Sequence, residues 1–440
     1  MEKTKENTLN DDKTSYKATV KMSFFFKGIS MLVPFVTTPI ILSSLGKSEY
    51  GLWSIVISMV SWLSLFDFGL INGIKNKLSK LIIEGKLKEA KVLIWGAFLF
   101  LSCISIALFF LFLFAYSICY ERVIDNINID SMPLLVFLFS VLANFVFSIV
   151  HAIANVTKQA SLKERTFAFA AIVNLCAILI CDRFFSIGIN ELFLIQSIAI
   201  LSAALQNTVL YFRNNRVLIP TKYSFSSIYE IKPIAKISGT FLVMQFSYLV
   251  LFTTDRIIIG SFVGLDDAAE YDLIYKFASL FLIAHSLINN PLWGIYSEKY
   301  IKEEFSWIRE MLVKQVLLFV MMIILAIMLY SFLPIIFSHW LGDGFLYSIV
   351  GAKAIFSFIM ICIWSNIFSI FLNSINSLKL QTYCSIVGAI LNIPISYFFV
   401  KYFDFGIEGV VLSSILCLLP FAVISPFVVN NLSKKKSELE

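Results

Sequence analysis

Polar side chains recur at helical spacing inside segments that are otherwise apolar enough to cross a membrane. Lys27 shares one such stripe with Ser30 and Thr37. With Pro34 between the last two, successive members are three or four residues apart and therefore lie on one face of a helix. A charge that faces lipid is costly, so this stripe predicts one wall of a hydrated pathway with a cation near its end. The alternative is a lysine that snorkels to the headgroups, which would not need the polar stripe.

A second stripe contains only neutral groups. Asn144, His151 and Asn155 repeat at helical spacing in a later apolar segment. Amides, hydroxyls and one imidazole suit the hydroxyl groups of a sugar, or water, better than a metal ion. Such residues also join helices within membranes, so one stripe alone is a weak signal. Its recurrence on several segments favours a pathway.

Charged neighbours occupy two segments in the second half of the chain. Asp255 and Arg256 point about 100° apart on a helix, so they cannot both face one partner directly. Asp272 and Lys276 lie one turn apart and can neutralise each other. Two interpretations stay open: a substrate pathway lined by these residues, or structural pairing between the two helices.

His285 and Asn289 form a further polar patch, one turn apart. A histidine inside a membrane span could relay protons in a coupled transporter, because its pKa lies near neutrality. A neutral, hydrogen-bonded histidine is the alternative interpretation.

These residues must be positioned by membrane-spanning helices. About 20 apolar residues cross a hydrocarbon core of about 30 Å. The 440-residue chain is 59% hydrophobic and only 15% charged, below the charge content of soluble domains. Twelve segments meet the length requirement, at about 22–45, 50–72, 92–119, 133–155, 167–184, 191–212, 236–262, 271–296, 313–337, 348–374, 382–400 and 409–430.

The distribution of positive charge sets the orientation of these spans. With twelve spans, 27 of the 35 lysines and arginines fall on the side that holds both termini, and four fall on the other side. Lysine and arginine are enriched in cytoplasmic loops, so both termini are predicted to be cytoplasmic. The first 17 residues mix both charges, which predicts a disordered tail rather than a signal peptide.

The two halves of the chain resemble each other. Val20–Ser23 (VKMS) is echoed by Ala235–Ser238 (AKIS), and Tyr50 by Tyr271. The alternative is that two apolar segments resemble each other by chance.

We therefore predict an all-α integral membrane protein of two pseudo-symmetric six-helix lobes, with a substrate route along the seam between repeats. The predicted boundaries are a tail 1–17, lobes 18–212 and 236–430, a linker 213–235 and a basic tail 431–440.

The sequence lacks the motifs that are typical of several classes of protein. The loops are short, and no nucleotide-binding glycine loop, HExxH or CxxC motif is present. The seven cysteines lie in apolar runs without metal-ligand spacing, so we predict no metal. The net charge of +6 belongs to the loops and does not indicate nucleic-acid binding. We predict no cofactor and no enzymatic activity, with proton or cation coupling as an open possibility.

One stretch, Leu42–Leu70, carries a family resemblance. It contains Leu45-Gly46, then Tyr50-Gly51-Leu52-Trp53, then Asp67 to Leu70. It resembles the polysaccharide-transporter branch of the multidrug/oligosaccharidyl-lipid/polysaccharide (MOP) exporter superfamily, which contains the Wzx-type O-antigen flippases. Thr253–Gly260 with Tyr271 looks like its counterpart in the second half.

The resemblance implies a flippase of the bacterial inner membrane. Its substrate would be an undecaprenyl-diphosphate-linked O-antigen or capsular repeat unit, moved by alternating access, with a polymerase and a chain-length regulator as protein partners. A diphosphate needs cations, and a further expectation is that Lys158, Lys163 and Arg165 capture the headgroup at the cytoplasmic face. The alternatives are a multidrug or cation antiporter of the same superfamily, or an integral polysaccharide polymerase or ligase.

Overall fold

The computed structural model confirms the all-α prediction. It describes residues 2–67, 70–119, 130–157, 159, 161–219, 224–231, 239–342 and 345–434, and these contain helices but no strand. In lipid, a helix satisfies every backbone hydrogen bond within its own segment, which is why apolar sequences of this length fold as helices.

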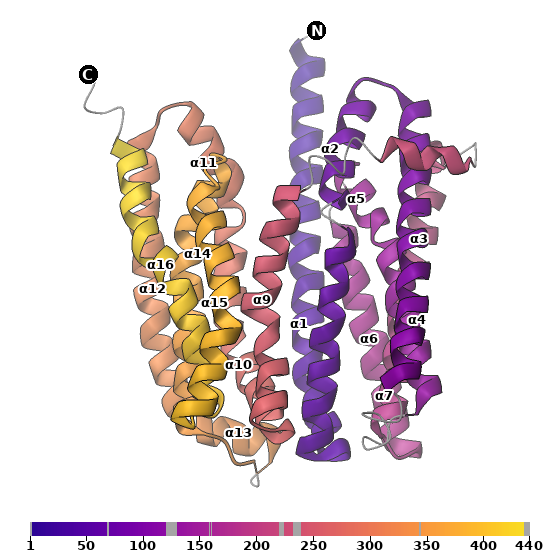
Figure 1. The fold of residues 1–440 in the computed structure, drawn as a ribbon. Helices are drawn as coiled ribbons and strands as arrows, with labels where there is room; N and C mark the ends of the chain where they lie inside the picture. Colours follow the sequence, from indigo (N-terminus) through magenta and orange to yellow (C-terminus); the bar gives the residue numbers. More distant parts are fainter. Residues whose placement is uncertain are drawn as a thin grey trace. The chain divides into compact units, whose positions relative to one another are not determined.

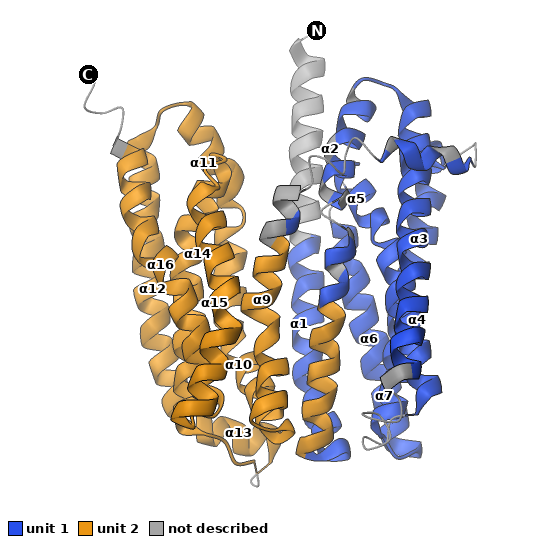
Figure 2. Ribbon diagram, in the orientation of Figure 1, with its two compact units in different colours: residues 1–46, 62–242 blue, residues 47–61, 243–440 orange. Residues whose placement is uncertain are grey.

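The chain divides into two compact units (Figure 2). The first contains residues 1–46 and 62–242, and the second contains residues 47–61 and 243–440. The sequence predicted that residues 47–61 belong to the first lobe, whereas in the structure they pack with the second unit. The reason is a set of contacts to α10, described below.

The first helical region, α1 (Glu2–Ser61), changes direction at Gly46. There the backbone is non-helical, with φ 75° and ψ 173°, a conformation that glycine adopts without steric cost. Gly46 thus separates the first two predicted spans. Within the predicted second span, 50–72, α1 gives way to a 3₁₀ helix, η1 (Trp62–Asp67), before α2 (Leu70–Ile83), so this span is not one α-helix.

The first unit continues with helices that surround one apolar core. Buried side chains of α2, α3 and α5, among them Leu78, Leu93 and Ile153, form this core. The predicted fourth span is interrupted at Ser148, whose hydroxyl donates to the carbonyl of Phe145 at 2.6 Å. These elements are α3 (Leu87–Cys119), α4 (Ser131–Phe147), α5 (Ile149–Val156), α6 (Ser161–Phe184), α7 (Ile189–Asn214), η3 (Arg216–Leu218) and η4 (Phe225–Glu230).

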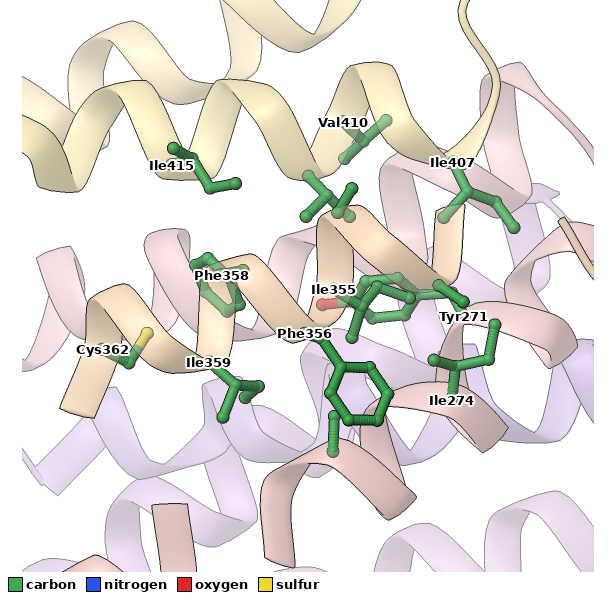
Figure 3. Packing of buried hydrophobic residues seen from close by; sticks show 14 of the residues in the cluster. Tyr271, Ile274, Ile355, Phe356, Phe358, Ile359, Cys362, Ile407, Val410 and Ile415 are labelled. Carbon is green, nitrogen blue, oxygen red and sulfur yellow. The ribbon is translucent and has the colours of Figure 1, made fainter. Parts of the chain in front are cut away.

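The second unit is organised around α14, most of which is buried. Figure 3 shows Tyr271 and Ile274 of α10, Phe358 of α14 and Val410 of α16 in one apolar cluster. The helices of this unit are α9 (Gly239–Phe262), α10 (Leu265–Asn289), α11 (Leu292–Ile301), α12 (Phe305–Ser331), α13 (Leu333–Leu341), α14 (Ile349–Ser374), α15 (Lys379–Phe403) and α16 (Ile407–Lys434) (Figure 1).

Ten helical stretches of the described residues are long and apolar enough to cross a membrane. The protein is therefore a multi-pass membrane protein. One of the ten, Met22–Ser61, contains the first predicted span and residues 50–61 of the second, and α9, which covers most of the predicted seventh, is not among them. The number twelve and the cytoplasmic position of the termini stay predictions.

The packing of α1 against α10 gives a stability prediction. A Cβ on Gly51 would lie 1.9 Å from the backbone carbonyl oxygen of Leu265, which cannot move like a side chain. We expect Gly51→Ala to destabilise the protein by about 1–3 kcal/mol through overpacking. Thermal unfolding of the purified protein measures this. Gly28→Ala is the matched control, because a Cβ there meets nothing within 4 Å. Equal unfolding temperatures for the two variants would contradict the close approach.

Candidate functional site

The centre of the candidate site is the carboxylate of Asp272 on α10. It accepts from Arg256 Nε at 2.7 Å and from Lys276 Nζ at 2.8 Å. The hydroxyl of Tyr50 donates to it at 2.8 Å, and Lys276 also contacts that hydroxyl. One buried carboxylate thus holds two cations and a phenol, so every charge of this ionic network has a partner, as an apolar environment requires.

Asp255 faces the other way from Arg256, as the helical geometry predicted. Its carboxylate accepts from the hydroxyls of Tyr271 at 3.1 Å and Ser414 at 2.9 Å. Ser414 in turn accepts from the side-chain amide of Asn392 at 2.9 Å. This second group links α9, α10, α15 and α16 through hydroxyl and amide groups, and Asp255 is fully buried within it.

Three contacts position Tyr50 next to the network. Lys47 Nζ lies 3.4 Å from the carboxylate of Glu270 and 3.2 Å from the carbonyl oxygen of Leu346. Glu270 also accepts from the backbone N–H of Ser348 at 2.7 Å. Together with Gly51, these contacts fasten the start of the 47–61 segment to α10 and to the residues that precede α14.

A cavity of about 430 Å³ lies within the second unit, between α9, α10, α14, α15 and α16. Tyr275 connects it to the network, since its ring lines the cavity and lies 5.0 Å from the guanidinium carbon of Arg256. The network is therefore not isolated in the core: it adjoins an internal space, and the side chain of Lys276 is 33% exposed.

The structure brings together four of the predicted site residues: Asp255, Arg256, Asp272 and Lys276. His285 and Asn289 are buried in the same unit. The amide of Asn289 donates to the carbonyl of Asn366 at 3.0 Å. No hydrogen bond of standard geometry reaches either ring nitrogen of His285 within the described residues. Gln315 lies close enough to interact with His285, so the hydrogen-bonded histidine and the proton relay both stay hypotheses.

The stripe around Lys27 lies in the first unit, and its hydroxyls bond to their own helix. Ser30 donates to the carbonyl of Lys27 at 2.9 Å, and Thr37 donates to that of Pro34 at 3.4 Å. Lys27 itself is half-buried. The other stripe crosses the break at Ser148, which leaves Asn144 on α4 and His151 with Asn155 on α5. Ser148 keeps helical dihedral angles, φ −59° and ψ −23°, so the direction of the helix continues through it and the stripe stays a prediction.

The predicted headgroup residues lie near the start of α6. The guanidinium Nε of Arg165 donates to the side-chain oxygen of Asn207 at 2.9 Å, and no described carboxylate pairs with it. Lys163 is exposed and its ammonium lies 5.9 Å from the ring centroid of Phe167. Lys158 lies outside the described residues. Arg165 therefore keeps guanidinium donors available for an anion.

Sequence reasoning assigned no chemistry to Tyr50, Tyr271, Asn392 or Ser414. Tyr50 and Tyr271 stood out only as repeat-related positions. A signal for the other two existed, because each is a polar residue within an apolar span. What was missing was the identity of the partner on another helix.

Comparison with known proteins decides the family. The model of the polysaccharide biosynthesis protein family matches residues 19–291, which is more than half of the chain. The chain belongs to this family. The match covers α9, α10 and thus Asp255, Arg256, Asp272 and Lys276.

Two relatives have the same name. A protein of Salmonella typhimurium named "Putative O-antigen transporter" is 26% identical over 392 residues, covering 86% of this chain and 87% of its own. Its Salmonella typhi namesake is 23% identical over 410 residues, covering 90% and 91%. The predicted resemblance to the polysaccharide-transporter branch is confirmed.

Solved structures confirm the fold of this family member. A multidrug resistance MATE family transporter of the MOP superfamily, in an inward-facing conformation, has a TM-score of 0.71 at 11% identity, over 93% of this chain and 96% of the other. A MOP superfamily transporter from Pyrococcus furiosus has a TM-score of 0.61 at 14% identity, over 96% and 97%. At these identities the likeness shows the fold alone.

The ionic network predicts unequal effects of two substitutions. Asp272→Ala leaves the buried Arg256, whose side chain is 15% exposed, without its carboxylate. We expect it to destabilise the protein by about 3–5 kcal/mol. Tyr50→Phe removes one hydroxyl and keeps both ion pairs, so we expect about 0.5–1.5 kcal/mol. Thermal unfolding in detergent compares them. Similar, small effects of both would show that Asp272 does not hold the network together.

Proposed function

We propose that this family member is a flippase that moves lipid-linked oligosaccharide repeat units, of O-antigen or capsule, across the bacterial inner membrane by alternating access. The observation that carries the proposal is the network of Arg256, Asp272 and Lys276 inside membrane-length helices, with Lys276 partly exposed. Fixed charges within a membrane span mark polar transport routes. The O-antigen transporter relatives support the choice of substrate.

The two cations of the network have different tasks in this proposal. Arg256 is the more deeply buried and stays with Asp272 throughout. Lys276 is the more accessible, so its ammonium can meet a negative group of the substrate, such as a diphosphate, without leaving Asp272 unpaired. The network therefore offers one anion contact without exposing an unpaired charge.

Arg165 and Lys163 form the cytoplasmic contact in this proposal. The predicted topology places the start of α6 on the cytoplasmic side, where a lipid-linked substrate is made. Among the described residues, Asn207 is the hydrogen-bond partner of the half-buried Arg165, whose guanidinium can bind a phosphate in a bidentate manner. This site would capture the headgroup before translocation.

The MATE-like fold supports a second candidate, a drug or cation antiporter. The two functions differ in what a deletion strain loses. Loss of the surface polymer while lipid-linked repeat units remain inside the cell supports the flippase. An intact polymer with altered dye efflux supports the antiporter.

Removal of the accessible cation tests the network. Lys276→Gln keeps the Arg256–Asp272 pair, so we expect normal membrane abundance. One lost charge-assisted contact corresponds to roughly tenfold weaker substrate binding. The readout is the amount of surface polymer on a polysaccharide gel of the complemented deletion strain. Lys353→Gln is the control, because Lys353 is exposed on α14 outside the network. Full complementation by Lys276→Gln would remove this residue from the proposal.

The cytoplasmic contact is tested separately. Arg165→Gln is expected to lower export of the polymer and to raise the pool of lipid-linked repeat units in the same complementation assay. The control is Arg183→Gln, since Arg183 is an exposed arginine in the last turn of the same helix. Indistinguishable polymer from the two variants would argue against headgroup capture at α6.

A further inference from the structure

The cavity of the second unit has an unusual lining for the interior of a helical membrane protein. None of the described residues that line it carries a charge. Its walls combine tyrosine and phenylalanine rings with neutral hydroxyl and amide side chains. The polar members are Ser286, Ser365, Asn366, Ser369, Gln381 and Ser385. A volume of about 430 Å³ lies in the range of small-molecule sites.

Two of the polar groups are left without a partner. Neither Ser365 Oγ nor Gln381 Oε1 has a hydrogen bond within the described residues, and both atoms are buried. Not every hydroxyl of the lining is like this, since Ser286 donates to the carbonyl of Ile283 at 2.7 Å. Buried polar atoms normally have partners, so these two are the positions in the lining where water or an occupant of the cavity would supply hydrogen bonds.

Aromatic rings line the same cavity and offer it an apolar surface. Tyr248 and Phe252 stack with their ring centroids 4.7 Å apart and their planes at 29°, and both line the cavity. A pyranose ring has one face of C–H groups and a rim of hydroxyls. It can therefore cover the aromatic rings and satisfy Ser365 and Gln381 at the same time.

Other kinds of occupant fit less well. An ionic ligand would find no opposite charge in the lining, and a hydrocarbon chain would leave both orphaned atoms unsatisfied. The ionic network lies on the other side of Tyr275 from the cavity. An anionic group of the substrate would therefore bind at the network and not inside the cavity.

We infer that this cavity is a sugar-binding subsite, which takes one neutral sugar residue of the transported glycan. The inference rests on the proposed function and adds to it a recognition site for the glycan that is separate from the cations. Sugar specificity would then reside in α14 and α15, which contribute Ser365 and Gln381.

The test uses the full chain in detergent and the free repeat-unit oligosaccharide, released by mild acid from the lipid-linked precursor of the host strain. Calorimetric titration measures its binding. We expect the wild-type protein to bind it, and Ser365→Val and Gln381→Leu each to weaken binding by roughly tenfold, one lost hydrogen bond each. Ser357→Val is the control, because Ser357 is exposed on α14 and donates to its own helix.

The outcomes separate the subsite from the proposed function. Unchanged binding in both cavity variants, with normal unfolding temperatures, would overturn the subsite. Absence of binding by a wild-type protein that still complements the deletion strain would also overturn it, while leaving the flippase proposal intact. A wild-type gene that does not restore the surface polymer would instead contradict the proposed function.

Discussion

The structure of the second unit depends on the neutralisation of charge within apolar helices. Asp272 meets Arg256, Lys276 and Tyr50 at hydrogen-bonding distance, so a carboxylate and two cations are buried together as one paired set. Removal of Asp272 would leave the buried Arg256 without its carboxylate in a medium of low polarity, which costs far more than a surface ion pair contributes. The ion pair between Arg256 and Asp272 thus joins α9 to α10.

The same constraint explains how the chain is divided. Residues 47–61 follow the first predicted span directly, yet they pack with the second unit because Tyr50 completes the network and Lys47 pairs with Glu270. Gly46 permits this by adopting a positive φ, which frees the segment from the direction of the preceding helix. The backbone conformation of Gly46 thus allows Tyr50 to reach Asp272.

The sequence was most informative where the answer is local. Helical geometry predicted that Asp255 and Arg256 have different partners, because they point about 100° apart, and that Asp272 can pair with Lys276; both are observed. Tyr50, Asn392 and Ser414 could not be assigned, because a polar residue in an apolar span indicates that a partner exists but not which helix supplies it. The change from α to 3₁₀ geometry after Ser61 was also missed, since a continuous apolar run does not reveal it.

Together, these features describe a membrane protein that carries polar groups in pairs and clusters within apolar helices, and we propose that a hydrophilic headgroup passes along them. The most direct measurement is translocation by the purified protein in proteoliposomes that contain lipid-linked oligosaccharide in one leaflet. The fraction that becomes accessible to a non-permeant sugar-oxidising reagent is followed over time. The account predicts a rise above protein-free vesicles that Lys276→Gln slows and Lys353→Gln does not. An accessible fraction equal to that of protein-free vesicles would contradict it.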